Sequence, residues 1–123
     1  MIVIRDAQMT ALSTLPEDQF QRSMAEFLRG HFPEAAAAPA GELTQFVGAQ
    51  FKKAKSYGLD SQHAAAVYIS TAWMMGDGFD DKSPVVQAEL SNTSVPAESR
   101  AFWLEEWCWQ AIDARQQMKE RPS

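Results

Sequence analysis

Three aspartates that lie close together in the sequence could hold a hard cation. Asp77, Asp80 and Asp81 follow a strongly apolar segment and are interspersed with two glycines and Phe79. Carboxylate oxygens are the ligands that calcium and magnesium prefer, but this spacing lacks the alternating acidic positions and the distal glutamate of an EF-hand loop. We therefore expect a structural turn, in which Phe79 returns to the core and an aspartate accepts main-chain hydrogen bonds. The loop consists of Gly76, Asp77, Gly78, Phe79, Asp80 and Asp81.

The other side chains with chemical potential are two histidines and one cysteine. His31 and His63 have no second histidine three or four residues away, and a lone cysteine cannot supply a zinc-binding pair, so a zinc site would need ligands from distant segments. Cys108 stands between Trp103 and Trp107 on one side and further apolar residues on the other, which predicts a buried, inert thiol. We expect no catalytic residue, no metal ligand and no cofactor, and hence a protein that is not an enzyme.

Composition predicts one acidic, cytoplasmic domain that spans residues 1–123. The 46% of hydrophobic residues is typical of a globular protein, and the formal charge of -5 makes a nucleic-acid partner a poor expectation, since phosphate binding needs clustered lysine and arginine. A single cysteine fits a reducing compartment. No apolar run approaches the ~20 residues of a membrane helix, and the opening MIVIRD is too short for a signal peptide.

Helical periodicity predicts an all-α fold. Apolar residues recur at spacings of three and four, and no strand-like alternation competes with them. We expect an irregular bundle of five to six helices in a single domain, with residues 1–5 as an apolar lead-in and residues 121–123 frayed. The segment from Asp60 or Ser61 to Gly76 is apolar around most of its circumference, which indicates a central helix packed on several sides.

Capping and breaking residues set the expected boundaries of the other elements. They predict a short helix over 6–13, a helix from a Thr14 capping box to Gly30, a loop over Ala35–Gly41, a helix ending at Gly58, a short helix over Pro84–Leu90 capped by Ser83, and a final helix over Val95–Glu120 capped by Ser94.

The final helix carries apolar residues on two opposed faces. At about 100° per residue, one face holds Leu104 and Cys108, while Val95, Phe102 and Trp109 form a narrow row nearly opposite. Two arrangements satisfy this pattern: the helix is sandwiched within its own bundle, or the row is exposed and docks another protein, since aromatic residues dominate interface hot spots. In the docking arrangement, the rim of the row would consist of Arg100, Glu105 and Glu106.

Short motifs in the first two thirds of the chain occur in a familiar order. They are MIVIRDAQM at the start, F-x(6)-FLRGHFP over Phe20–Pro33, AKSYGL over Ala54–Leu59, VYI over Val67–Ile69 and GDGFD over Gly76–Asp80. This order resembles small bacterial proteins encoded beside type VI secretion effectors, notably with PAAR or VgrG spike proteins and toxin genes. The tryptophan-rich final helix lies outside the resemblance.

The resemblance implies an accessory role in the bacterial cytoplasm. It implies a co-chaperone or adaptor that helps to load an effector, with the effector, its chaperone or a spike protein as partner. An immunity protein that neutralises a cognate toxin is the first alternative, because acidic groups often complement a basic cleft. The second alternative is a metal-dependent enzyme that uses the Asp77–Asp81 loop. The oligomeric state is left open by the sequence.

Overall fold

The computed structural model describes residues 16–120 of the chain, with side chains through residue 114. The prediction of a single all-α domain is confirmed, and no strand occurs within 16–120. Seven helices are described where five to six were expected, because two short helices, α3 and α6, occupy segments that were taken as connections. The helices are α2 (Glu17–His31), α3 (Pro33–Ala37), α4 (Ala40–Ser56), α5 (Gln62–Met75), α6 (Phe79–Lys82), α7 (Pro84–Ser91) and α8 (Ala97–Glu120).

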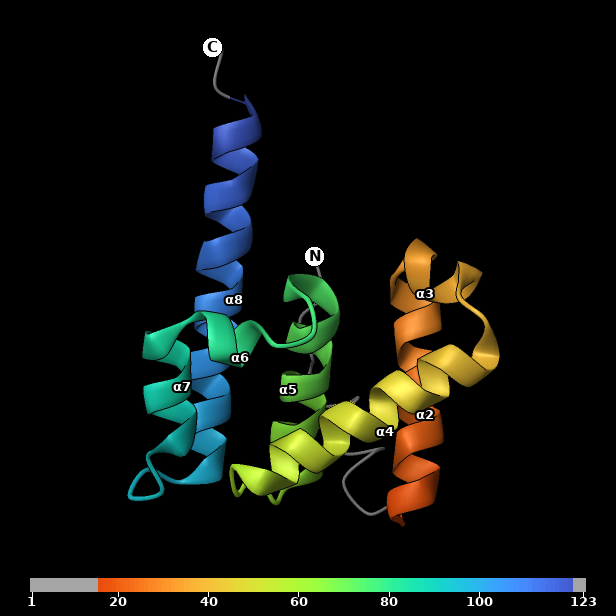
Figure 1. Ribbon diagram of the computed structural model, residues 1–123, viewed down its shortest axis with the longest axis horizontal. Coiled ribbons are helices and arrows are strands. Elements are labelled where there is room, and N and C mark those ends of the chain that lie inside the picture. The colour runs from red at the N-terminus through yellow and green to blue at the C-terminus, as the bar shows by residue number, and fades with distance from the viewer. Residues whose placement is uncertain (1–15, 121–123) are drawn as a thin grey trace.

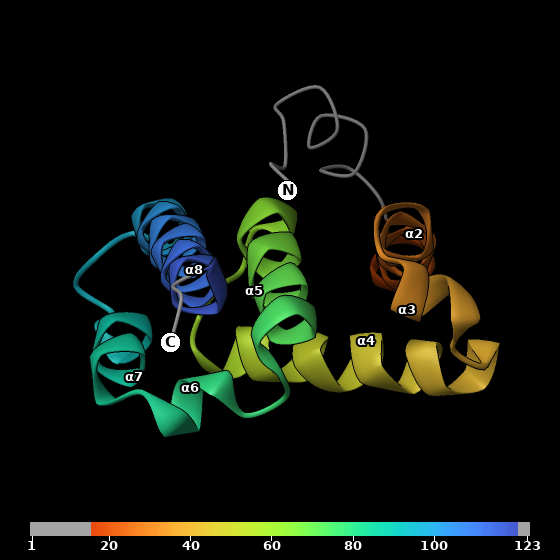
Figure 2. The ribbon, with the colours of Figure 1, turned by 90° about the horizontal axis from the view of Figure 1, so that it is seen from above.

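The helices form two layers. Figure 2 shows α2, α5 and α8 nearly end-on in one layer, with α4 running across α2 and α5 and with α6 and α7 continuing the second layer beneath α8. Helix α5 lies in the middle of the first layer, and its main neighbours are α8 and α4. This arrangement buries the apolar faces of all three helices, which is the usual way that helices hide apolar surface from water.

Helix α5 is the central element that its sequence predicted. Its residues from 64 to 72 are all buried, and four of these nine are alanines, which let neighbouring helices approach closely. Ser61 provides the start, because its Oγ accepts a 3.0 Å hydrogen bond from the amide of Ala64. Gly76 ends the helix with a φ of 103°, a conformation that side chains other than glycine's rarely allow.

Two further boundary predictions are confirmed. Gly58 follows α4 with a φ of 78°, and the amide of Leu59 bonds back to the carbonyl of Ala54 at 3.0 Å, as in a glycine-terminated helix. Ser83 caps α7, because its Oγ accepts a 3.3 Å hydrogen bond from the amide of Val86. These two signals succeed because they depend only on local backbone geometry.

Three boundary predictions were wrong for local reasons: the loop over 35–41, the start of α2 and the start of α8. Most of the segment expected to form a loop over Ala35–Gly41 belongs to α3 or α4, and only Ala38 and Pro39 lie between the two helices. The reason is that alanine favours helix wherever proline does not interrupt it. The cap position of α2 is Pro16, two residues after the expected cap at residue 14. The segments expected over 1–5 and 6–13, and the cap residue 14, lie outside the described residues.

Helix α8 begins at Ala97 and not at Val95. Ser94 does not cap it, since its amide and Oγ both bond to the side chain of Asn92, at 3.3 and 2.5 Å. The preceding residues therefore form a tight polar turn. Among the helices that the structure describes, none is both long and apolar enough to cross a membrane.

Candidate functional site

The glycine-aspartate loop after α5 turns the chain back onto the core. Gly76 and Gly78 both have positive φ, at 103° and 81°, and Gly78 precedes the single turn of α6. This turn directs the buried ring of Phe79 between two aromatic rings, with centroid distances of 5.2 Å to Tyr68 and 6.1 Å to Trp107. The loop therefore joins α5, α6 and α8 through aromatic packing.

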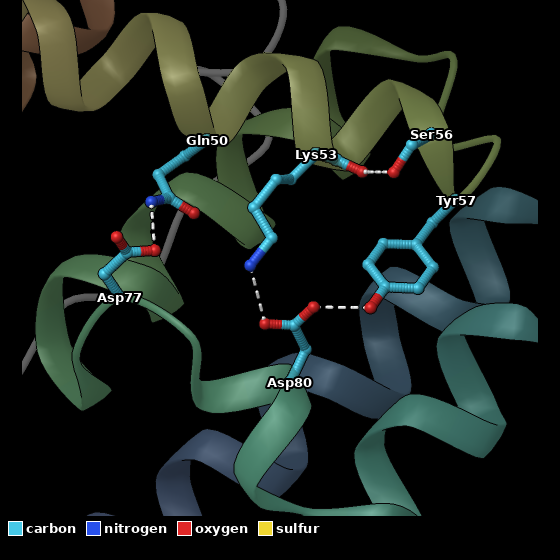
Figure 3. Close-up of polar contacts among 6 residues, drawn as sticks. All are labelled: Gln50, Lys53, Ser56, Tyr57, Asp77 and Asp80. Atoms are coloured by element: carbon cyan, nitrogen blue, oxygen red, sulfur yellow. Dashed lines mark hydrogen bonds and ion pairs between the residues drawn. The ribbon is translucent and has the colours of Figure 1, made fainter.

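Asp80 is a buried carboxylate that connects α6 to the end of α4. It is only 1% exposed, and its oxygens accept hydrogen bonds from the ammonium of Lys53 at 2.9 Å and from the hydroxyl of Tyr57 (Figure 3). Burial alone would raise the pKa of Asp80, but the hydrogen bonds from Tyr57 and Lys53 and the positive charge of Lys53 outweigh it and lower that pKa. The charged form is thus the stable form in the folded protein.

The two tyrosines beside this carboxylate are held neutral. Burial, and then the negative charge of Asp80, raise the pKa of Tyr57 well above its ordinary value, and the same two causes act on Tyr68. A neutral phenol can donate a hydrogen bond to a carboxylate, whereas a phenolate would repel it. The arrangement is therefore suited to stabilising one fixed charge state and not to transferring protons near neutral pH.

The other two aspartates of the loop point elsewhere. Asp77 is exposed and accepts a 2.8 Å hydrogen bond from the buried amide of Gln50 (Figure 3). Asp81 is also exposed. In the part of the chain that the structure describes, no three histidine, cysteine or acidic side chains are placed so that they could hold a metal ion together. Of the histidines, His63 pairs with Glu98 at 2.5 Å and His31 is exposed, with its ring 4.4 Å from that of Phe27.

The expectation that Arg100 lies on the rim of a surface patch was wrong. It is 3% exposed and donates to three main-chain carbonyls: Val95 at 2.9 Å, Tyr57 at 2.6 Å and Leu90 at 2.7 Å. Two of these carbonyls belong to the C-terminal ends of α4 and α7, which lack helical partners and carry partial negative charge. The guanidinium satisfies them, and this pulls the side chain inward.

The remaining predicted docking residues lie at or near the surface. Phe102 is 68% exposed, one of the two most exposed large apolar side chains in the described part of the chain. Trp109 is half-buried and lies about two turns after Phe102 in α8. Val95 is half-buried in the turn that precedes the helix. Glu105 is half-buried and Glu106 is exposed. The opposite face of α8 holds the buried residues Ala101, Leu104 and Cys108.

The polar network around Tyr57 was missed by the sequence analysis. Lys53 and Tyr57 were taken as ordinary residues near the end of a helix, although their spacing of four places them on one face of it. Arg100 offered a second signal, since its spacing of four from Leu104 places it on the apolar face of the last helix. Neither pattern identifies a partner, because the partners come from α6 and from the ends of α4 and α7.

The chain matches no protein-family model, no curated protein and no solved structure. Its class is therefore defined by the fold and the site alone: a single all-helical domain with a polar junction inside and an aromatic residue exposed on its longest helix.

Proposed function

We propose that this chain is a non-catalytic protein-binding domain whose docking face is the exposed side of α8. The observation that supports this most is the exposure of Phe102. A phenylalanine that is 68% exposed in mid-helix contributes nothing to the core of its own domain, whereas aromatic side chains of this kind anchor protein interfaces. Trp109 extends the apolar surface along the same side of the helix.

The more specific proposal is an adaptor or co-chaperone that helps to load a type VI secretion effector in the bacterial cytoplasm. Its support is the order of short motifs in the first two thirds of the chain, together with the docking face. An immunity protein that neutralises a toxin is the second candidate, favoured by the acidic side chains Glu105 and Glu106 beside Phe102. An adaptor would bind a toxic effector without inhibiting it, whereas an immunity protein would abolish its activity.

A metal-dependent enzyme is the weaker alternative. The carboxylate that it would need most, Asp80, is buried and already bonded to Lys53 and Tyr57. Thermal melting with added calcium, magnesium or zinc tests this alternative, because a ligand that binds only the folded state raises the melting temperature. A concentration-dependent rise that Asp77→Asn removes would revive the enzyme proposal.

Co-purification tests the docking proposal. Tagged wild type and a Phe102→Ser variant would each be expressed with the proteins encoded beside the gene, and recovered partners would be identified by mass spectrometry. We expect a partner whose recovery falls with Phe102→Ser. Val85→Ser is the matched control, because Val85 is similarly exposed, at 63%, but belongs to α7. A partner that is retained equally by both variants would place docking elsewhere, and recovery of no partner would refute the binding role.

A further inference from the structure

The docking face of α8 has a defined chemistry. At about 100° per residue, five side chains between residues 102 and 114 fall within an arc of about 100° on the side of the helix opposite the core. None of the five is buried. We refer to this set as the outer face of α8: Phe102, Glu105, Glu106, Trp109 and Asp113.

In the part of α8 whose side chains are described, residues 97–114, the outer face is acidic and carries no basic residue. Between residues 97 and 114, Arg100 is the only basic residue, and its guanidinium is buried against carbonyls. No ion pair with another described side chain involves Glu105, Glu106 or Asp113. Glu98 falls in the same arc, one turn before Phe102, but it differs because it bonds to His63 and Ser61.

The pKa of Glu105 is shifted mainly by its partial burial. Partial burial raises the pKa of this carboxyl; the positive charge available to His63 opposes the shift, and the negative charge of Glu106 adds to it. The charged form of Glu105 is thus disfavoured in the isolated domain. A cation placed beside Glu105 and Glu106 would favour the charged forms of both carboxyl groups.

The shape of this region fits an elongated partner. In Figure 1, α8 extends well past α5, α6 and α7, and no described element accompanies its C-terminal part. A projecting helix offers a long, straight surface on which another helix can lie side by side. Such pairs bury alternating apolar residues between them and place charged residues at the edges.

Charge decides which occupant suits this surface. A second copy of the chain would bring its own carboxylates against Glu105, Glu106 and Asp113, and like charges across an interface are costly. Nucleic acid would present phosphates to the same acidic surface. An amphipathic helix with an apolar stripe and flanking lysine or arginine would meet both the aromatic and the acidic side chains with complementary groups.

We propose that the outer face of α8 binds a positively charged amphipathic helix of a partner protein, with Phe102 and Trp109 in its apolar stripe and Glu105, Glu106 and Asp113 against its basic residues. This inference rests on the proposed docking function and specifies the partner's chemistry.

A designed probe tests it directly. The probe is a fluorescently labelled peptide of about five helical turns, built from leucine and lysine so that leucine forms one stripe. Two matched peptides serve as controls: one replaces lysine by glutamate, and the other replaces leucine by serine. Fluorescence anisotropy would measure the affinity of each peptide for the wild type over a range of salt concentrations. We expect the leucine–lysine peptide to bind, the two controls to bind at least about tenfold more weakly, and the affinity to fall as salt rises.

Variants localise the binding. Phe102→Ser is expected to weaken the leucine–lysine peptide by about tenfold or more, and the double change Glu105→Gln with Glu106→Gln by several-fold with a flatter salt dependence. The controls are Val85→Ser, on α7, and the pair Glu26→Gln with Glu42→Gln, two exposed carboxylates on α2 and α4. Circular dichroism melts would verify that all variants fold. Equal weakening by the test and control variants, or tight binding of the leucine–glutamate peptide, would overturn the inference.

The outcomes separate this inference from the docking function itself. A co-purified partner that depends on Phe102, combined with a leucine–lysine peptide that does not bind, would keep the function and overturn the charge chemistry. Binding of the peptide at the outer face, combined with recovery of no partner protein, would keep the chemistry and remove the function.

Discussion

Arg100, in α8, donates a 2.6 Å hydrogen bond to the main-chain carbonyl of Tyr57 at the end of α4. The side chain of the same tyrosine donates to Asp80 in α6. Tyr57 is therefore the junction at which α4, α6 and α8 meet, because its carbonyl accepts from Arg100 and its hydroxyl donates to Asp80. A buried arginine and a buried aspartate, each satisfied by groups from other helices, fix how these helices are arranged. The junction lies on the buried side of α8, away from the exposed outer face.

Removal of the Arg100 guanidinium is expected to be strongly destabilising. Arg100→Met keeps an apolar stem but leaves the carbonyls of Tyr57 and Leu90 without their donor, so we expect a loss of about 3 kcal/mol in the free energy of unfolding. Urea titration measures it. Arg22→Met is the control, because the Arg22–Asp18 pair is largely exposed, and a change within about 0.5 kcal/mol is expected there. Equal losses of unfolding free energy in Arg100→Met and Arg22→Met would mean that Arg100 is not an interior residue.

Acid should weaken the domain partly through Asp80. The folded state lowers the pKa of Asp80 below its ordinary 3.8, so the unfolded chain binds the proton more tightly. The resulting stabilisation is complete above pH 3.8 and is lost as the pH falls below 3.8 through the folded-state pKa. Glu98, whose pKa is also lowered because the hydrogen bonds from His63 and Ser61 outweigh burial, contributes with the same sign below its ordinary 4.5.

Asp80→Asn tests this pH dependence. The variant should be less stable at neutral pH and should lose less stability than the wild type as the pH falls below 3.8, measured by urea unfolding at several pH values. Asp81→Asn is the neighbouring control, because Asp81 is exposed and its acid dependence should equal that of the wild type. An Asp80→Asn curve parallel to that of the wild type would contradict the role assigned to this carboxylate.

Both tyrosines of the chain should resist ionisation until the protein unfolds. The chain contains two tyrosines, Tyr57 and Tyr68, and the pKa of each is raised above its ordinary 10.0 by burial and by the negative charge of Asp80. Because the folded state retains these protons, stability is complete below pH 10.0 and is lost as the pH rises above it. The phenolate absorbance of the native protein should therefore appear above pH 10.0, together with loss of helical circular dichroism. In concentrated urea, it should titrate near the ordinary value.

The two glycines Gly78 and Gly30 should respond in opposite directions to alanine. Neither has a neighbour that an added methyl group would meet, so space does not decide the outcome. Gly78 has a φ of 81°, and Gly78→Ala should cost about 1 kcal/mol of folding free energy. Gly30 lies in α2, where Gly30→Ala should raise stability by about 0.5 kcal/mol. Thermal unfolding of both variants measures the difference, and a stabilised Gly78→Ala would show that the loop geometry is not as described.

Substitutions of the aromatic residues on the two sides of α8 should have different effects on stability. Trp107 stacks on Phe79, so Trp107→Ala is expected to cost about 2 kcal/mol. Phe102 is 68% exposed, so Phe102→Ala should leave the free energy of unfolding within about 0.5 kcal/mol of the wild type. Guanidinium unfolding of both variants provides the measurement. A large loss for Phe102→Ala would assign Phe102 to the core and remove the basis of the docking proposal.

Much of the secondary structure could be read from the sequence because it depends on neighbouring residues. Ser61 and Ser83 each accept a hydrogen bond from an amide three residues on, and Gly58 and Gly76 adopt dihedral angles that few other residues tolerate. These are local constraints, so a single sequence displays them. The largely apolar circumference of α5 likewise predicts a central helix without knowledge of its partners.

The sequence by itself determined that this chain is an all-helical domain with one central helix and an apolar row opposed to the core on its last helix. Only the tertiary structure decided what becomes of the charged residues. Helical spacing places Arg100 on the face of Leu104 and Cys108, but it does not name the main-chain carbonyls that let a charged side chain be buried there. The physical reason is that burial of a charge requires partners, and those of Arg100 and Asp80 come from helices that meet only when the whole domain is assembled.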